Sequence, residues 1–235
     1  MVPDVLALAQ AAARGAALPA GVLEDRATAF RRVYEESLWS KGESRSGPGS
    51  TQEHARGALI AVRAVLQKTQ ARTLLDVGCG DLNWLGPLVA EHAERAAAGG
   101  EAVRFAAVDI VDTAFAEAAQ RYPSCSFAVI DVVTAVPPQA DVVLCRQCLN
   151  HMSASDALSA IANIRASGAA YLLASHYPDA HNDAAATAAG ITYRQHNLAA
   201  SPFDAAMPGP PLETFEDEYD AQQAATPMCL ALWRL

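Results

Sequence analysis

The sequence has 235 residues, a formal net charge of −9, and 51% hydrophobic against 18% charged residues. This balance excludes general disorder, and the acidic charge argues against a nucleic acid as the main partner, since phosphate binding needs a basic surface. No segment has the length of a membrane span, and the N-terminus lacks the basic region of a secretory signal. We therefore expect one α/β domain in the cytoplasm, with neither a membrane nor a nucleic acid as its partner.

The five cysteines are odd in number, which predicts free thiols rather than a disulfide framework in a cytoplasmic chain. Cys145 and Cys148 form a lone C-x-x-C. A zinc site at this spacing would need a second pair of ligands, and the neighbouring sequence does not supply one. We expect no metal ion in the protein.

The first 70 residues are expected to form a helical cap or lid on a core that spans 71–235. Residues 22–39 have an amphipathic helical pattern, and 42–50, GESRSGPGS, have the composition of a loop. Ser50 precedes Glu53 by three positions, which is the spacing of a capping box. The sequence therefore predicts that a second helix begins at Ser50.

Beyond residue 70, short apolar runs alternate with alanine-rich helical patterns. This alternation predicts a doubly wound, Rossmann-like α/β fold with a parallel sheet buried on both faces. Two further strand patterns near the C-terminus lack an intervening helix and predict an antiparallel pair, for seven strands in all. The expected strands are 73–77, 104–110, 126–132, 140–145, 169–175, 211–219 and 227–235, and the expected helices are 84–97, 113–122 and 153–167.

Three of these strands end on an acid, namely Asp76, Asp109 and Asp131. Ligands of doubly wound sheets bind at the carboxyl ends of the strands, and a turn with Gly78 and Gly80 would let backbone amides approach a ligand there. A carboxylate at the end of the second strand can accept hydrogen bonds from both hydroxyls of a ribose. The pattern therefore predicts a nucleoside-containing ligand.

The glycines do not fit the fingerprint of dinucleotide-binding proteins. That fingerprint, G-x-G-x-x-G, would need a glycine where Asn83 stands. The neighbouring Asp81 would repel a pyrophosphate, whereas it would attract an ammonium or a sulfonium. The sequence therefore disfavours an NAD-dependent oxidoreductase and predicts a cationic ligand.

The stretches LLDVGCGDLNW, VDI and DVVLCRQCLNHMS resemble motifs of the class I S-adenosylmethionine (SAM)-dependent methyltransferases. The resemblance covers roughly residues 72–175, and the terminal strand pair is similar to the antiparallel hairpin of that fold. The chain departs from the family at Leu82, where the longer glycine pattern has a further glycine. The resemblance implies that SAM is the cofactor and that a methyl group is transferred.

The resemblance also implies individual cofactor contacts. Asp109 would hold the ribose hydroxyls, Asp131 would lie at the adenine amino group, and Asp81 would lie near the methionine ammonium. Residues 40–51 would form the lid. Its expected contacts are Trp39, Ser46 and Ser50. The full set of expected cofactor-binding residues is Asp76, Gly78, Gly80, Asp81, Asp109, Ile110, Asp131, Val132 and Arg146.

Methyl transfer is an in-line displacement that needs alignment of the reactants, and a base when the acceptor is a hydroxyl. His151 and His176 follow the fourth and fifth strands and are the candidate bases, since histidine takes a proton near neutral pH. For each of them, a loop histidine bonded to backbone is an equal alternative. Asn150 would orient an amine acceptor. Arg146 is open to a second role, either with an anionic substrate or in a buried ion pair.

We therefore expect O- or N-methylation of a small molecule in bacterial biosynthesis, with a homodimer as one option for the assembly. Two alternatives stay open. One is a SAM cyclase or lyase of the same fold that releases methylthioadenosine. The other is a SAM-binding regulatory module that catalyses nothing. The sequence does not name the acceptor.

Overall fold

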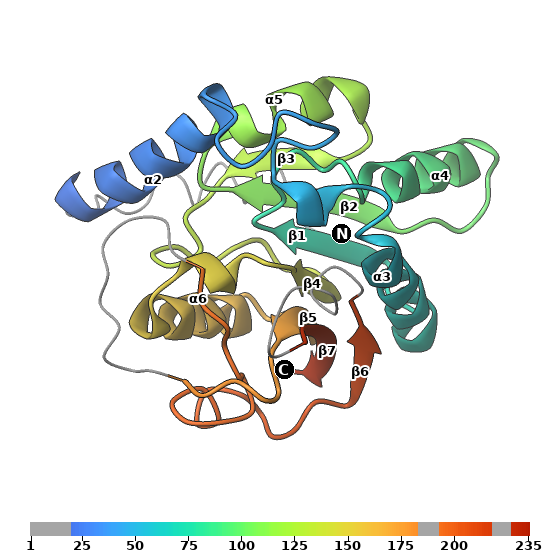
Figure 1. The fold of residues 1–235 in the computed structure, drawn as a ribbon. Helices are drawn as coiled ribbons and strands as arrows, with labels where there is room; N and C mark the ends of the chain where they lie inside the picture. The colour runs from blue at the N-terminus through green and yellow to red at the C-terminus, as the bar shows by residue number, and fades with distance from the viewer. Residues whose placement is uncertain (1–19, 183–192, 218–226) are drawn as a thin grey trace.

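The computed structural model describes residues 20–182, 193–217 and 227–235. Within them, seven strands form one sheet in the order β3-β2-β1-β4-β5-β7-β6 (Figure 1). The first five strands pair in parallel, and β7 runs antiparallel to both β5 and β6. This confirms the predicted Rossmann-like fold. The strands are β1 (Thr73–Val77), β2 (Arg104–Asp109), β3 (Ser126–Val129), β4 (Val142–Cys145), β5 (Tyr171–His176), β6 (Glu213–Glu216) and β7 (Cys229–Arg234).

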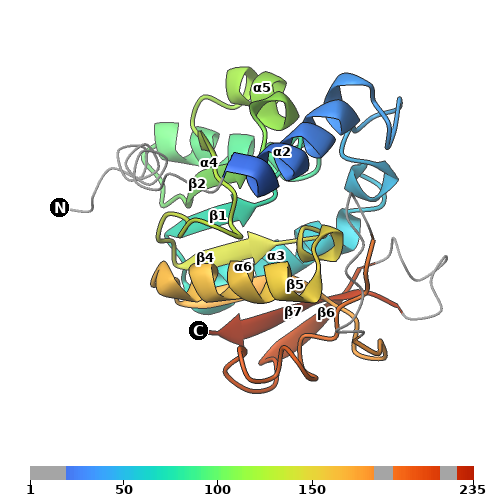
Figure 2. The ribbon, with the colours of Figure 1, turned by 90° about the vertical axis from the view of Figure 1, so that its left-hand side faces the viewer.

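Helices cover both faces of the sheet (Figure 2). Residues of α3, α4 and α5 share one apolar cluster with the strands, and α6 belongs to a second. Strand residues enter the two clusters alternately, as Leu74 and Leu75 of β1 do, because successive side chains point to opposite faces. The helices are α2 (Ala20–Glu35), α3 (Arg56–Thr69), α4 (Gly86–Ala97), α5 (Asp112–Arg121) and α6 (Ala154–Ala166), with 3-10 helices η1 (Pro48–Ser50) and η2 (Leu149–His151).

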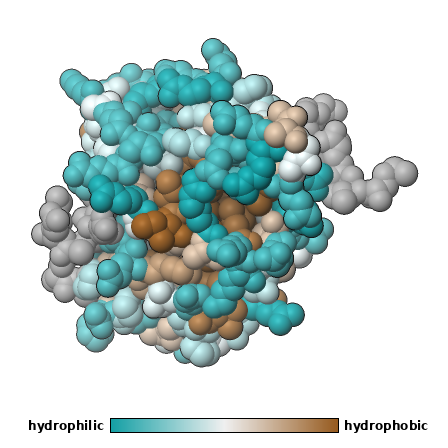
Figure 3. All heavy atoms as spheres, turned by 90° about the vertical axis from the view of Figure 1, so that its right-hand side faces the viewer, coloured by the Kyte–Doolittle hydropathy of each residue, from teal (hydrophilic) through white to brown (hydrophobic). Residues whose placement is uncertain are grey.

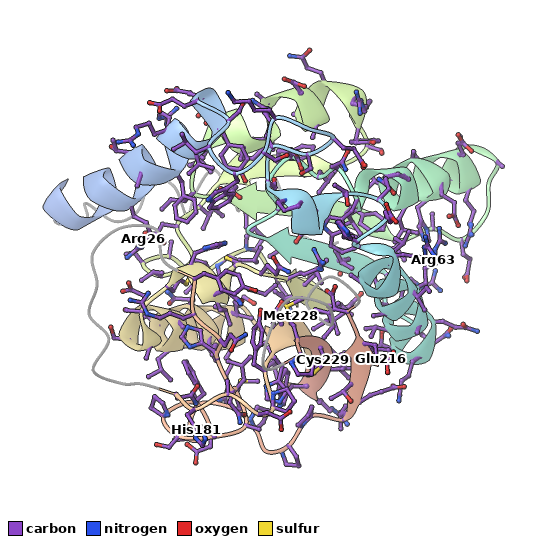
Figure 4. The ribbon with its side chains drawn as sticks, viewed as in Figure 1. Arg26, Arg63, His181, Glu216, Met228 and Cys229 are labelled. Atoms are coloured by element: carbon purple, nitrogen blue, oxygen red, sulfur yellow. The ribbon has the colours of Figure 1, made fainter. Side chains whose placement is uncertain are left out.

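Helix α2 lies between α5 and α6 and is tied to both (Figure 2). The guanidinium of Arg31 is 3.0 Å from Asp112 of α5, and that of Arg26 is 3.4 Å from Asp156 of α6. Figure 4 shows Arg26 on the opposite side of the molecule from Arg63 of α3. The described part of the N-terminal region therefore reaches across the molecule.

Helix α3, which the sequence analysis grouped with the cap, packs in the same apolar cluster as the sheet through Ala58, Val62 and Val65. Its Gly57 allows a close approach to β6, because a Cβ there would lie 2.7 Å from the carbonyl oxygen of Glu216. The helix is thus continuous with the core. The expected helical residues 1–19 lie outside the described residues, as do the last two of the expected strand 211–219.

One local prediction is wrong. Ser50 does not begin a long helix, because it ends η1 and α3 begins at Arg56, after Ala55 and without a side-chain cap. The Asn83 side chain donates a hydrogen bond of 2.9 Å to the Ser50 carbonyl, which ties this segment to the loop after β1. A tertiary contact has outweighed the local capping signal of Ser50 and Glu53.

The face on the side of α3 and α4 is hydrophilic around a central apolar area (Figure 3). Charged side chains there form pairs, such as Arg63 with Glu91 and Arg72 with Glu101. Among the described residues, no helix is both long enough and apolar enough to cross a membrane. The residues predicted to bind a ligand lie elsewhere, where the parallel strands end.

Candidate active site

The chain leaves β1 through a turn in which Gly78 and Gly80 have positive φ, 73° and 56°. The backbone amides of Gly78 and Cys79 donate to the Val108 carbonyl of β2 at 2.9 and 3.1 Å, which fixes the turn against the sheet. A Cβ on Gly78 would lie 2.5 Å from the Cys148 Sγ, so only glycine fits there. The turn therefore brings backbone directly to the floor of a cavity.

Asp109 ends β2 beside this turn, and its side chain is buried. The carboxylate accepts hydrogen bonds from the backbone amides of Gly80 at 3.0 Å and Val111 at 3.4 Å. Burial raises the pKa of Asp109 to about 6, since these amides offset only part of the lost hydration. The turn thus orients a partly desolvated acceptor group.

Asp76 lies on β1, one residue before the strand ends, and is also buried. Burial, and after it the charge of Asp109, raise the pKa of Asp76 to about 7, against the opposing effect of Arg146. Two carboxylates in one desolvated region repel each other when both are ionised. A cationic ligand between them would relieve this repulsion.

Asp131 follows β3, and its carboxylate lies 2.6 Å from the guanidinium of Arg26 on α2. It also accepts a hydrogen bond of 3.0 Å from the backbone amide of Val133. Burial raises the pKa of Asp131, and the charge of Arg26 opposes this shift. The N-terminal helix thus contributes a cation to the end of β3.

An open cavity lies at the ends of these strands. All but one of the predicted cofactor-binding residues line it, and so do the three predicted lid contacts Trp39, Ser46 and Ser50. The sequence therefore identified residues that the fold brings into one cavity. The cofactor-binding candidates that line it are Asp76, Gly78, Gly80, Asp109, Ile110, Asp131, Val132 and Arg146.

Asp81 is the exception among the predicted cofactor contacts, and its carboxylate binds the N-terminal segment instead. It accepts hydrogen bonds from the Ser44 hydroxyl at 2.9 Å, from the Arg45 backbone amide at 2.7 Å and from the Ser46 hydroxyl at 3.1 Å. Asp81 is not among the residues that line the cavity, and its expected contact with a methionine ammonium stays a prediction. The backbone amide of Asn83 donates a further hydrogen bond to this carboxylate at 3.2 Å, so four protein groups bond it.

Arg146 follows β4 and lines the cavity, but its guanidinium is held by protein groups. Two of its nitrogens bond the Asp217 carboxylate at 2.7 and 3.0 Å, and a third donates to the Gly49 carbonyl at 3.0 Å. The guanidinium also lies 5.3 Å from the centre of the Trp84 ring. Arg146 is therefore the buried ion pair that the sequence analysis left open as one of its alternatives.

Four rings form one side of the cavity, which we call the aromatic wall: Phe30, Tyr34, Trp39 and His151. Trp39 stacks on His151 with ring centres 4.9 Å apart and an angle of 21°. Phe30 meets Trp39 edge to face at 5.8 Å, and Tyr34 meets it at 6.2 Å. The predicted base His151 thus faces the cavity as part of an aromatic surface.

The other two candidate catalytic residues lie outside the lining. His176 is buried, accepts the Leu198 backbone amide on Nδ1 at 3.1 Å and packs on Trp233. Burial lowers the pKa of His176 to about 4, which leaves the ring neutral near pH 7. The structure therefore places this histidine at the end of β5, bonded to backbone and outside the cavity lining.

Asn150 is buried behind the lining. Its side-chain amide donates to the Tyr177 hydroxyl at 2.8 Å, which lies 2.5 Å from the Tyr193 hydroxyl. The Tyr193 ring then contacts His151, with ring centres 5.9 Å apart. Asn150 is therefore linked to the aromatic wall through the two tyrosines and does not itself line the cavity.

Several lining residues were not predicted as site residues, chiefly Arg26, Phe30 and Tyr34 of α2. These three recur at intervals of four along the helix, so they share one face. The amphipathic pattern of 22–39 predicts a helix, but the pattern alone does not show what its apolar face covers. Trp84, Cys148 and Met152 were also not predicted, although each lies in one of the two longer stretches that resemble methyltransferase motifs.

Comparisons with known proteins find the fold through structure alone. No family model matches the sequence, and no curated protein does. A solved 1,6-didemethyltoxoflavin N1-methyltransferase from Burkholderia thailandensis, with 1,6-didemethyltoxoflavin and S-adenosylhomocysteine bound, is 20% identical with a TM-score of 0.58, over 88% of this chain and 86% of that one. The magnesium protoporphyrin IX methyltransferase from Synechocystis PCC 6803, with bound S-adenosylhomocysteine, is 16% identical with a TM-score of 0.57, over 88% and 94%. The chain therefore has the class I methyltransferase fold.

Proposed function

We propose that the protein transfers a methyl group from SAM to a small molecule. The observation that carries this is the position of Asp109, buried at the end of β2, held by the Gly80 amide and facing the cavity. A carboxylate there accepts both ribose hydroxyls of a nucleoside. The solved proteins of this fold that hold S-adenosylhomocysteine support the same cofactor.

The remaining lining residues fit the parts of SAM. Ile110 and Val132 offer apolar contacts to an adenine ring, and Asp131 is an acceptor for its amino group. Asp76 and Asp109 give the cavity a negative charge that favours a sulfonium and an ammonium. When bound, SAM supplies an activated methyl group whose leaving sulfur keeps the electrons of the broken bond.

His151 is the residue of the wall that we propose as the base. In the transfer, an oxygen or nitrogen of the acceptor forms the new bond to the methyl carbon, and the proton that it loses passes to the imidazole. His151 lines the cavity and is held in place by Trp39. The choice between O- and N-methylation depends on the acceptor that the wall admits.

Incubation of the purified protein with SAM alone tests this function. We expect SAM to raise the melting temperature and to stay intact in mass spectra until an acceptor is added. Release of methylthioadenosine without an acceptor would instead favour a cyclase or lyase. A SAM-bound protein that methylates nothing in a screen of alcohols, amines and heterocycles would be a regulatory module. Absence of any SAM binding would contradict all three.

A further inference from the structure

Gln147 is a strained, unsatisfied residue at the cavity. It follows β4 with a φ of 49°, a left-handed conformation that side chains other than glycine rarely adopt. Its backbone amide donates to the Ser175 hydroxyl at 2.8 Å, which holds the residue in this conformation. Its side-chain Nε2 is buried and has no hydrogen-bond partner among the described residues. Strain and an unpaired buried donor together mark a functional position.

The aromatic wall faces the same cavity as Gln147. Its rings pack on one another, Trp39 and His151 face to face and Phe30 edge to face with both of them. Aromatic surfaces of this kind bind other planar rings, by offset stacking or edge-to-face contact. A saturated ring or a sugar would leave much of this surface poorly packed.

The two arginines that line the cavity each form an ion pair with an aspartate of the described residues. Arg26 pairs with Asp131, and Arg146 pairs with Asp217. The two remaining acids, Asp76 and Asp109, belong to the strand ends where the cofactor is proposed. Neither arginine of the lining is thus left unpaired for an anionic acceptor, which disfavours an acceptor with a negative charge.

We propose that the methyl acceptor is a planar aromatic or heteroaromatic molecule without a negative charge that packs against the aromatic wall and accepts a hydrogen bond from the side-chain amide of Gln147 through a carbonyl oxygen or a ring nitrogen. This inference rests on the proposed function, because the acceptor lies beside bound SAM. The amide donor fixes the orientation of the ring, and the wall fixes its plane. Gln147 is in this sense a specificity-determining residue.

Equilibrium dialysis against three named probes, with S-adenosylhomocysteine present, tests the inference. 4-Quinolone is planar with a carbonyl acceptor, naphthalene is planar without one, and cyclohexanone has a carbonyl without an aromatic ring. We expect 4-quinolone to bind at least about tenfold more tightly than cyclohexanone. Gln147→Leu should weaken 4-quinolone about tenfold, the effect of losing one buried hydrogen bond, and leave naphthalene unchanged.

Trp39→Leu should weaken both planar probes, and Gln67→Leu, at an exposed position on α3, should change none. S-Adenosylhomocysteine should still raise the melting temperature of all three variants, which shows that they are folded. If it does so and 4-quinolone binds no better than cyclohexanone, or binds Gln147→Leu equally well, the inference is overturned and the proposed function stands. If neither SAM nor S-adenosylhomocysteine binds the unaltered protein, both are overturned.

Discussion

The two sides of the cavity are built by different parts of the fold. On one side, Asp76 and Asp109 belong to strands whose backbones pair within the sheet. On the other, the aromatic wall comes from α2, the segment after it and η2, and the pairing of its rings is by side-chain contact. The sheet fixes the position of the acids, whereas the wall depends on helix α2 staying in place.

This difference separates two kinds of substitution. A change among the strand-end residues acts on a rigid framework, so it should alter stability or cofactor binding directly. A change in the wall alters a surface that can repack, so it should act mainly on the acceptor. The same framework can thus serve different acceptors when the N-terminal helix carries different rings.

The largest effect is expected where the framework meets the C-terminal hairpin. Asp217→Ala should lower the free energy of unfolding by about 3–5 kcal/mol, because it leaves the Arg146 charge buried without its partner. Urea denaturation measures this. Glu101→Ala breaks the exposed pair with Arg72 and should cost only about 0–1 kcal/mol. Equal effects of the two changes would show that the strand-end side is not the rigid one.

Cofactor binding tests the acids directly. Asp109→Ala should weaken SAM by about 1.5–3 kcal/mol in isothermal titration calorimetry, through loss of charge-assisted hydrogen bonds to the ribose. Asp112→Ala, three residues on and exposed in its pair with Arg31, is the matched control and should leave SAM affinity unchanged. Unchanged affinity in Asp109→Ala would place the cofactor elsewhere.

The same division explains what could be predicted from the sequence. The strands, their terminal acids and the glycine turn are local patterns, so their meeting at one edge follows from the parallel sheet. The partners of Asp81 and Arg146 could not be predicted, because each bonds a segment distant in sequence, Ser44 or Asp217. The sequence does not distinguish His151 from His176 as the candidate base. Their packing differs in the structure, because His176 is buried against Trp233 whereas His151 lines the cavity.

Gly80 lies where the framework and the N-terminal segment touch. A Cβ there would lie 2.2 Å from the Ser46 Oγ, and its φ of 56° already disfavours alanine. Gly99 has a similar φ of 76° but nothing within 4 Å of such a Cβ, so Gly99→Ala isolates the cost of the backbone. We expect Gly80→Ala to lower the free energy of unfolding by about 1–3 kcal/mol more than Gly99→Ala does, in urea denaturation. An equal cost would mean that the Ser46 segment moves away freely.

The last effect concerns the pH dependence of stability. The pKa of Asp76 is raised from its ordinary value of 3.8 to about 7 in the folded chain, so between these values the folded state binds more protons than the unfolded state. Stability from this group is therefore present at low pH and falls as pH rises toward 7. Between pH 5 and 6.5, Asp76→Asn should reduce the loss of unfolding free energy with rising pH by up to about 1.4 kcal/mol per pH unit, measured by urea denaturation.

Asp179→Asn, at an exposed position, should leave that slope unchanged. Saturating SAM should also flatten the slope in the unaltered protein, because a cation beside Asp76 favours its ionised form and lowers its pKa. If SAM binds without changing the slope, the positive charge of the cofactor lies away from the paired acids. The cavity would then owe its affinity for SAM to the ribose and adenine contacts, and the acids at the ends of β1 and β2 would have separate roles.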